Sequence, residues 1–163
     1  MSLAPALSNS FRITPETAAD RDEVDALVLA AFGPGRFAKT AERIRETAPM
    51  VAAFTAREDG RLIGSVRLWS ITVDGLGALF LGPITVAKDV RSGGLGADLV
   101  GVCIGEAQGR GVAGVLLVGD PPYFQRFGFQ SAPDVRLPGP ADPRRVLWLP
   151  ITSAAPSGLA LPA

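Results

Sequence analysis

One segment constrains the fold of this chain more than any other, because an apolar strand, a glycine-rich turn and an apolar helix follow one another directly. Residues Ala78–Val86 are almost entirely apolar, which is typical of a central strand covered on both faces. The turn Arg91–Gly96 leads into a helix predicted from about Gly94 to Arg110, and a short buried strand follows at Val115–Val118. A strand–helix–strand unit within one sheet is parallel and right-handed. The sequence therefore predicts one parallel pair of neighbouring strands.

The remaining periodicities place further strands and helices around this unit. Val24, Leu27, Val28 and Ala31 have helical spacing, and a second helix is predicted over Phe37–Thr47. Two Asp-Gly turns separate the next strands, a pattern that favours antiparallel hairpins. The further strands are predicted at residues 11–13, 51–56 and 62–73, after Gly128, and at 146–151. We therefore predict an α/β (α+β) fold, with a mixed, mostly antiparallel sheet of six to seven strands and helices on both faces.

Length and composition indicate a single domain. The 163 residues are 47% hydrophobic, which is enough for one sizeable core. No linker divides residues 11–152, which we assign to that domain. We expect residues 1–10 to form a flexible arm, and residues 153–163 to form a frayed, Pro-rich tail.

The charge balance and the missing residue types exclude several classes of function. Sixteen basic and sixteen acidic residues cancel, which argues against a nucleic-acid partner. There is no histidine, and Cys103 is the only cysteine, so a His-based triad, an intramolecular disulfide and a typical His/Cys zinc site are excluded. A carboxylate magnesium site stays formally open, although we expect no metal. No apolar stretch could cross a bilayer and residues 1–10 lack a basic n-region, so we expect a cytoplasmic location without membrane association.

The glycine-rich turn has the composition of a phosphate-binding backbone. The first N–H groups of a helix have no internal partners, and the helix dipole favours negative charge there. Gly93, Gly94 and Gly96 would let a phosphate approach the main chain closely. The turn lacks the Gly-Lys-Ser/Thr of a P-loop and the third glycine of a dinucleotide fingerprint. A pyrophosphate site is one interpretation, and a plain helix start is the other.

Two motifs together resemble a known family. The pattern Arg91-x-x-Gly94-x-Gly96 after an apolar strand is similar to the acetyl-CoA signature of the GNAT superfamily of N-acetyltransferases. The segment Gly119–Phe129 contains the sequences Gly-Asp-Pro and Arg-Phe-Gly-Phe. It resembles the second motif of that family and points to its YhbS-like bacterial branch. The resemblance covers roughly residues 11–151 and is specific because both motifs occur in the right order and separation.

The resemblance implies a site for acetyl-CoA, or coenzyme A, as co-substrate. The two central parallel strands would splay apart to admit it. Main-chain groups of Ile84, Thr85 and Val86 would bind the pantetheine arm, which lies like an additional strand. The N–H groups that bind the pyrophosphate would come from Arg91, Ser92, Gly93, Gly94, Leu95 and Gly96. Pro83 indicates either a bulge that re-aims these groups or a mere bend in the strand.

Catalysis of acetyl transfer needs a departing amine proton, a stabilised oxyanion and a leaving thiolate. Family members often protonate the thiolate with a Tyr four residues before the Gly of Gly-Phe, and this chain has Phe124 there. Tyr123 is one position earlier, about 100° around a helix, so it is either a displaced acid or a packing aromatic. Asp120 either orients or deprotonates the amine, or it forms an Asx turn before two prolines.

These observations predict a function and leave one alternative open. The predicted activity is transfer of an acetyl group from acetyl-CoA to a primary amine by direct attack in a ternary complex. The alternative is a non-catalytic acyl-CoA-binding or sensing module, which Phe124 favours. The acceptor would be a small-molecule amine or a peptide N-terminus, bound by the segments Phe32–Phe37 and Pro133–Arg145. The protein would be a monomer or a homodimer.

The helix after the turn has two rows of interest. Leu95, Leu99, Cys103 and Ala107 recur at every fourth residue, with Val102 beside them, so we expect this face to be buried and Cys103 to be a core residue. A second row contains only small residues and would either let the helix approach the sheet or reflect composition alone; its members are Ala97, Gly101, Gly105 and Gly109.

Overall fold

The structure is a computed structural model that describes residues 11–32, 44, 47–139 and 141–163, without the side chains of residues 91–93. The predicted N-terminal arm, residues 1–10, lies outside the described residues. So does most of the second predicted helix, Phe37–Thr47. No helix among the described residues is long and apolar enough to cross a membrane.

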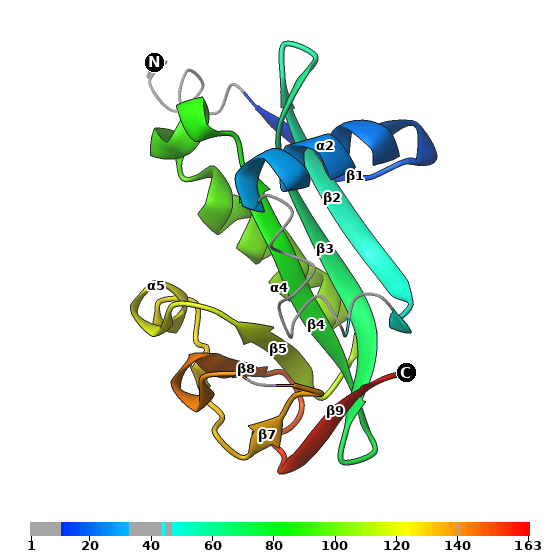
Figure 1. Cartoon of the computed structure of the whole chain (residues 1–163), viewed down its shortest axis with the longest axis vertical. Helices are drawn as coiled ribbons and strands as arrows, with labels where there is room; N and C mark the ends of the chain where they lie inside the picture. Colours follow the sequence, from blue (N-terminus) through cyan, green and yellow to red (C-terminus); the bar gives the residue numbers. More distant parts are fainter. Residues whose placement is uncertain (1–10, 33–43, 45–46, 140) are drawn as a thin grey trace.

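A central sheet carries the fold (Figure 1). The described residues form nine strands of it where six to seven were predicted, because two short strands pair beside its main path. Seven strands form one continuous path across the described sheet, namely β1 (Arg12–Pro15), β2 (Met50–Glu58), β3 (Arg61–Val73), β4 (Leu76–Val86), β5 (Gly114–Val118), β8 (Val146–Pro150) and β6 (Gln130–Ser131). The neighbours along this path are antiparallel except β4 and β5, which are parallel. The prediction of a mixed, mostly antiparallel sheet is confirmed.

Helices cover both faces of this sheet, as predicted. The helix α2 (Arg21–Phe32) crosses in front of the sheet in Figure 1, and α4 (Leu95–Arg110) lies behind it. A third, short helix, α5 (Pro121–Gln125), follows β5. Alternating strand residues fill a core on each face. Leu79 and Leu81 belong to the core beneath α4, whereas Phe80 belongs to the core on the opposite face.

The turns that connect β2, β3 and β4 match the predicted Asp-Gly hairpins. Asp59 and Gly60 have φ values of 51° and 81°, and Asp74 and Gly75 have 53° and 75°. Two successive residues with positive φ are the requirement of a type I′ turn, which matches the twist of antiparallel strands. Local chemistry therefore sets the register of both hairpins.

The two parallel strands separate soon after they meet. Leu79 pairs with Val115 and Phe80 with Leu116, and the described register between β4 and β5 contains no further pairs. Residues 81–86 of β4 therefore continue with only β3 as a neighbour, while β5 follows β8. This geometry is the splay that the family resemblance implies.

Pro83 occupies a bulge in β4, which is the first of the two interpretations of this residue. The register between β3 and β4 shifts between Val66 and Leu68, so that Arg67 alone faces the dipeptide Gly82-Pro83. A bulge places one additional residue in a strand and re-aims the groups that follow it. The segment beyond the bulge is the part of β4 that diverges from β5.

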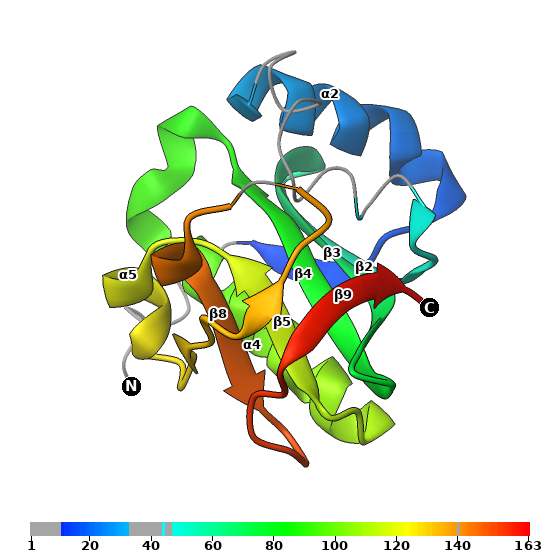
Figure 2. The same cartoon turned by 60° about the horizontal axis from the view of Figure 1, so that its bottom comes forward.

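The expectation of a frayed tail is wrong. Residues Gly158–Pro162 form β9, which pairs with the end of β3 and with the short strand β7 (Val135–Arg136), as Figure 2 shows. The reason is that β3 is longer than β2, so its last residues would otherwise present an unpaired edge. Trp148 of β8 also holds the first residue of the tail against the sheet, because its Nε1 donates a hydrogen bond to the carbonyl of Ser153 at 3.1 Å.

The helix α4 buries the predicted row of residues, but the buried residue beside this row is not the predicted one. Leu95, Leu99, Cys103 and Ala107 are all buried, whereas the flanking buried residue is Val100 and Val102 is only half-buried. Burial raises the pKa of the Cys103 thiol to about 12, which agrees with its expected role as a core residue.

The row of small residues is not what allows α4 to pack closely on the sheet. A Cβ added at Gly101, Gly105 or Gly109 would meet nothing within 4 Å, so these glycines face away from the protein. A residue two positions after Leu99 lies about 200° around the helix, which explains the outward direction. The close approach is provided by Gly64 of β3, where a Cβ would lie 2.9 Å from Leu95 Cδ2.

Candidate functional site

The N-terminus of α4 presents free backbone donors beside the splayed strands. Gly94 caps the helix with φ 73° and ψ 15°, the left-handed conformation that glycine adopts without strain. The first bond of the helix joins the N–H of Asp98 to the carbonyl of Gly94 at 3.0 Å. The N–H groups of Leu95, Gly96 and Ala97 therefore precede the helical ladder and are available to an anion.

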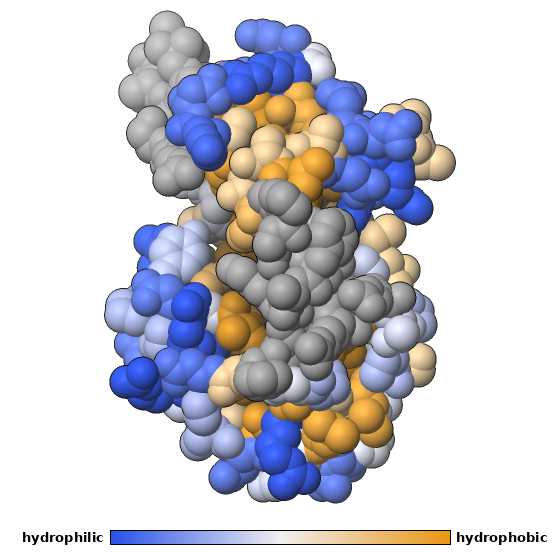
Figure 3. Space-filling model, in the orientation of Figure 1, coloured by the Kyte–Doolittle hydropathy of each residue, from blue (hydrophilic) through white to orange (hydrophobic). Residues whose placement is uncertain are grey.

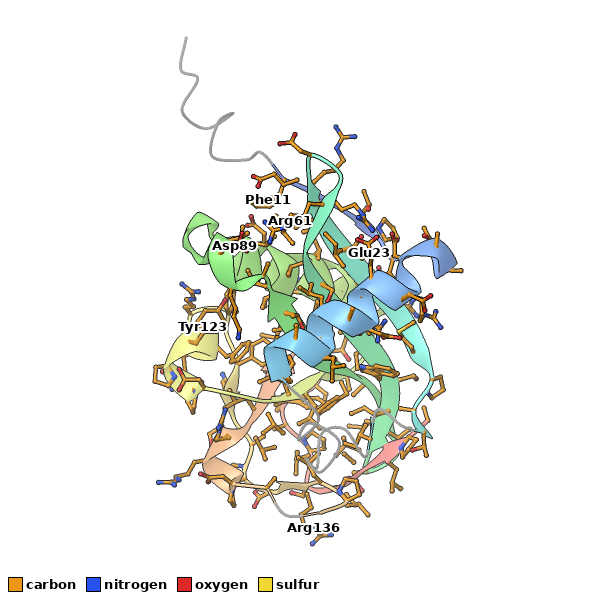
Figure 4. The ribbon with its side chains drawn as sticks, turned by 45° about the horizontal axis from the view of Figure 1, so that its top comes forward. Phe11, Glu23, Arg61, Asp89, Tyr123 and Arg136 are labelled. Carbon is orange, nitrogen blue, oxygen red and sulfur yellow. The ribbon has the colours of Figure 1, made fainter. Side chains whose placement is uncertain are left out.

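An ion pair at the surface holds the 3₁₀ segment Lys88–Gly93, which leads into this helix. The Arg61 guanidinium, from the β2–β3 hairpin, donates two hydrogen bonds of 2.7 and 2.8 Å to the Asp89 carboxylate (Figure 4). These bonds hold the pKa of Asp89 below its ordinary value. The Asp89 carboxylate, two residues before the turn, is thus already paired with a cation, whereas Asp98, two residues after the turn, is exposed.

The free edge of β4 lies along the same side of the molecule. Ile84, Thr85 and Val86 pair with β3 through Val66, Ser65 and Gly64, and β5 has left their other edge. An extended ligand could therefore bind there like a strand. The hydroxyls of Thr85 and its cross-strand neighbour Ser65 are buried without a hydrogen-bond partner among the described groups.

The segment after β5 carries the two predicted catalytic candidates. Asp120 precedes α5 with an extended backbone, is exposed, and makes no side-chain capping hydrogen bond. Tyr123 is half-buried on α5 and points toward the start of α4. Its hydroxyl would lie 3.1 Å from a Cβ at Gly96, so the absence of a Cβ is what admits this contact.

Phe124 stands at the position where the family pattern has a Tyr, and its ring is packed tightly. A Cβ at Gly119 would lie 2.5 Å from Phe124 Cε2, and the ring meets Phe129 edge-on with centroids 5.7 Å apart. Tyr123 and Phe124 are themselves nearly perpendicular, with 85° between their planes. The Tyr123 hydroxyl lies at Gly96, whereas the Phe124 ring packs on Gly119 and Phe129, and only Tyr123 has a proton to donate.

Sequence reasoning missed a buried ion-pair network opposite the bulge. Arg67 donates two hydrogen bonds, of 3.1 and 3.2 Å, to the carboxylate of Glu16, whose side chain is only 1% exposed. Arg67 also pairs with Asp25 of α2 at 3.2 Å. The sequence feature that could have indicated this network is an arginine within the mostly apolar strand β3. Beside it, Trp69 Nε1 donates to the Gly82 carbonyl at 2.6 Å, so the Trp69 side chain holds the bulge.

A pocket of about 270 Å³ lies within the segment predicted to bind the acceptor. The surface that lines it is about equally polar and apolar, and its lining residues are Pro133, Val135, Arg136, Leu137, Gly139, Ala141, Pro143 and Val146. Val146 pairs with Val118, the last residue of β5, so the pocket reaches the strand beside the splay. The other predicted acceptor segment, Phe32–Phe37, lies almost wholly outside the described residues. No cluster of three or more potential metal ligands occurs in the described part of the chain.

Comparison with known proteins decides the family. The model of the acetyltransferase (GNAT) family matches residues 18–129. The chain belongs to this family. It is 31% identical over 123 residues to YhbS of Escherichia coli K12, an uncharacterized N-acetyltransferase, with 74% of each chain covered. The YhbS-like resemblance of the sequence is thereby confirmed.

Solved structures of family members have the same fold. The crystal structure of E. coli YhbS in complex with CoA matches with a TM-score of 0.79 and 27% identity, covering 94% of this chain and 90% of the other. A GNAT family acetyltransferase from Brucella melitensis, in complex with acetyl-CoA, matches with a TM-score of 0.72 and 21% identity, covering 94% and 96%. The second likeness supports the fold alone.

Proposed function

We propose that this protein transfers an acetyl group from acetyl-CoA to a primary amine. The observation that carries the proposal is the splay of β4 and β5, which leads directly to the free N–H groups at the start of α4. An extended arm ending in a pyrophosphate is a ligand that both features fit. YhbS, with which the chain shares its family and fold, has been crystallised with CoA.

The proposed binding mode assigns separate parts of the ligand to separate backbone segments. Main-chain groups of Ile84, Thr85 and Val86 bind the pantetheine arm along the open edge of β4. The pyrophosphate lies against the turn Arg91–Gly96 and the first N–H groups of α4. Open space at Gly94, where a Cβ would meet nothing within 4 Å, is compatible with a phosphate there.

The chemistry that we propose is a direct attack of the amine on the thioester carbonyl. The amine nitrogen forms the new C–N bond and loses a proton, while the C–S bond breaks and the sulfur leaves as the thiolate of CoA. The bulge at Pro83, fixed by Trp69, would position the backbone at which the thioester binds. Asp120 is exposed after β5 and would orient or deprotonate the amine, directly or through water.

The departing thiolate lacks the usual proton donor in this chain, because Phe124 carries no hydroxyl. Tyr123 is the other predicted candidate for the acid, but its hydroxyl lies at Gly96, at the start of α4. Positioning of the two reactants and exclusion of water would then supply most of the rate, with solvent protonating the thiolate.

The acceptor that we propose is a small-molecule amine or a peptide N-terminus. The pocket formed by residues 133–146 has a volume of about 270 Å³ and a lining that is about equally polar and apolar, which suits a small molecule that carries both kinds of group. Ultracentrifugation would distinguish a monomer from a homodimer. Hydrophobic surface gathers over β9 in Figure 3, where Leu159 and Leu161 are 39% and 46% exposed, and a homodimer would cover such surface.

We propose the cytoplasm as the compartment, to be tested by cell fractionation.

Phe124 also favours a second candidate function, a non-catalytic acyl-CoA-binding or sensing module. Acetyl-CoA should be incubated with the protein and a panel of primary amines, and free thiol release should be measured together with the acetylated product. Amine-dependent release supports the transferase. Tight binding of acetyl-CoA without release for any amine supports the binding module, and failure to bind CoA contradicts both.

A further inference from the structure

Tyr123 of α5 lies against the start of α4, and Arg126, the residue directly after α5, lies over the ring of Tyr123. Tyr123 is held by edge-on contacts with Phe124 and Phe127, whose ring centroids lie 4.9 and 5.6 Å away. Its hydroxyl lies against Gly96, the second residue of α4. The hydroxyl makes no hydrogen bond to any group that the structure describes, so its donor and acceptor capacity is available at the phosphate-binding turn.

Arg126 extends this surface. Its guanidinium carbon lies over the ring of Tyr123, 4.2 Å from the centroid, and 5.0 Å from the centroid of Phe127. No described group accepts a hydrogen bond from this guanidinium, so its five N–H donors are available. The aromatic contacts therefore position the cation without using its donors.

The charge of Arg126 is not neutralised within the described part of the protein. Most other arginines have a carboxylate partner there, including Arg57, Arg61, Arg67 and Arg110. No described carboxylate forms an ion pair with Arg126, and its side chain is exposed. An exposed, unpaired cation held on the ring of Tyr123, whose hydroxyl lies at the start of α4, is suited to bind a phosphate bidentately.

We infer that the Tyr123 hydroxyl and the Arg126 guanidinium bind the pyrophosphate of CoA, opposite the N–H groups of α4. This inference rests on the proposed function and adds side-chain ligands to a site otherwise built from backbone. The pyrophosphate and the thioester are separated by the whole pantetheine arm. A hydroxyl that reaches the pyrophosphate therefore binds the co-substrate and does not protonate the thiolate.

Binding measurements test the inference without needing an acceptor. CoA and dephospho-CoA, which keeps the pyrophosphate but lacks the 3′-phosphate, should be titrated calorimetrically into the wild type and the folded variants Arg126→Gln and Tyr123→Phe. We expect Arg126→Gln to weaken both ligands equally, by about tenfold, and Tyr123→Phe to weaken both several-fold. Arg126→Lys should recover part of the loss, because it keeps the charge but not the bidentate geometry.

Arg12→Gln is the matched control, because Arg12 is an exposed arginine on β1, the edge strand at the end of the sheet opposite β8 and β6. It should leave the affinity unchanged. Unchanged affinity in the α5 variants would overturn the inference while leaving the proposed function intact. A loss confined to CoA would assign Arg126 to the 3′-phosphate and overturn it as well. A wild type that binds neither ligand would overturn both proposals.

A double-mutant cycle tests the contact itself. Gly96→Ala places a Cβ where the Tyr123 hydroxyl lies, so it should displace that hydroxyl and weaken CoA binding. In the Tyr123→Phe background the hydroxyl is already absent, and the additional loss from Gly96→Ala should be smaller. Losses that simply add would show that the two positions act independently, which would contradict the inferred arrangement.

Discussion

The β4–α4 turn and the segment that follows β5 lie on the same side of the splay but work in different ways. The turn offers main-chain N–H groups, whose positions follow from a helix start and from Gly94 in its left-handed conformation. The second segment offers side chains, and the ring planes of Tyr123 and Phe124 are nearly perpendicular. A backbone site is therefore fixed by local geometry, whereas a side-chain site depends on the packing of neighbouring elements.

The largest effect should come from removing the packing that holds the backbone site. Leu99 is fully buried and lies against β3 at Gly64. Leu99→Ala should lower the free energy of unfolding by about 2–5 kcal/mol, measured by urea denaturation. It should also weaken CoA binding, because α4 carries the free N–H groups. Val102→Ala, at a half-buried position of the same helix, should cost less. Unchanged CoA affinity in Leu99→Ala would separate the packing of α4 from the site.

The next effect probes the backbone donors directly. Gly94→Asp places a negative charge at the helix N-terminus where the pyrophosphate should bind, and calorimetry should show roughly a hundredfold loss of CoA affinity. Gly94→Asn is the matched control, because Asn tolerates the left-handed conformation and is neutral. If the Asp and Asn variants bound CoA equally well, the turn would not bind the phosphates.

The third prediction concerns the position at which the family pattern has its acid. Phe124→Tyr adds a hydroxyl at that position, and it should raise kcat by about tenfold or more if the leaving thiolate lies there. CoA affinity should stay unchanged. The measurement is thiol release with an amine that the wild type accepts. A variant that is folded and no faster would show that residue 124 does not face the sulfur.

A smaller effect on the chemical step is expected at the neighbouring position. Tyr123→Phe should raise KM for acetyl-CoA while kcat falls by much less than the roughly hundredfold expected for a lost general acid. The reason is that the hydroxyl lies at Gly96. A fall of kcat by several orders of magnitude at unchanged CoA affinity would restore Tyr123 as the acid.

The sequence predicted well those features that local chemistry determines. Both Asp-Gly hairpins, the helix start at Gly94 and the helix stop at Gly111 depend on residues that adopt positive φ. The parallel crossover followed from the order of elements. These features need no knowledge of distant contacts, which is why periodicity and turn residues were enough.

Features that depend on distant contacts could not be predicted in this way. The strand β9 forms because β3 extends beyond the end of β2. This difference in length appears only once the strands are paired. The ion pair of Arg67 with Glu16 joins residues far apart in the chain. Likewise, the aim of Tyr123 at Gly96 required the packing of α5 on α4. The part of the candidate site that could not be predicted from the sequence is thus the part made of side chains.

The smallest effect distinguishes glycines that serve the site from glycines that do not. Gly105 faces open space in α4, so Gly105→Ala should raise the free energy of unfolding by about 0.4–1 kcal/mol, because alanine has the higher helix propensity. CoA affinity should be unchanged. Gly64→Ala is the contrasting variant and should be destabilising, since its Cβ would lie 2.9 Å from Leu95 Cδ2. Urea denaturation measures both. A destabilised Gly105→Ala would mean that a partner surface covers this row, and the outward face of α4 would then belong to an interface.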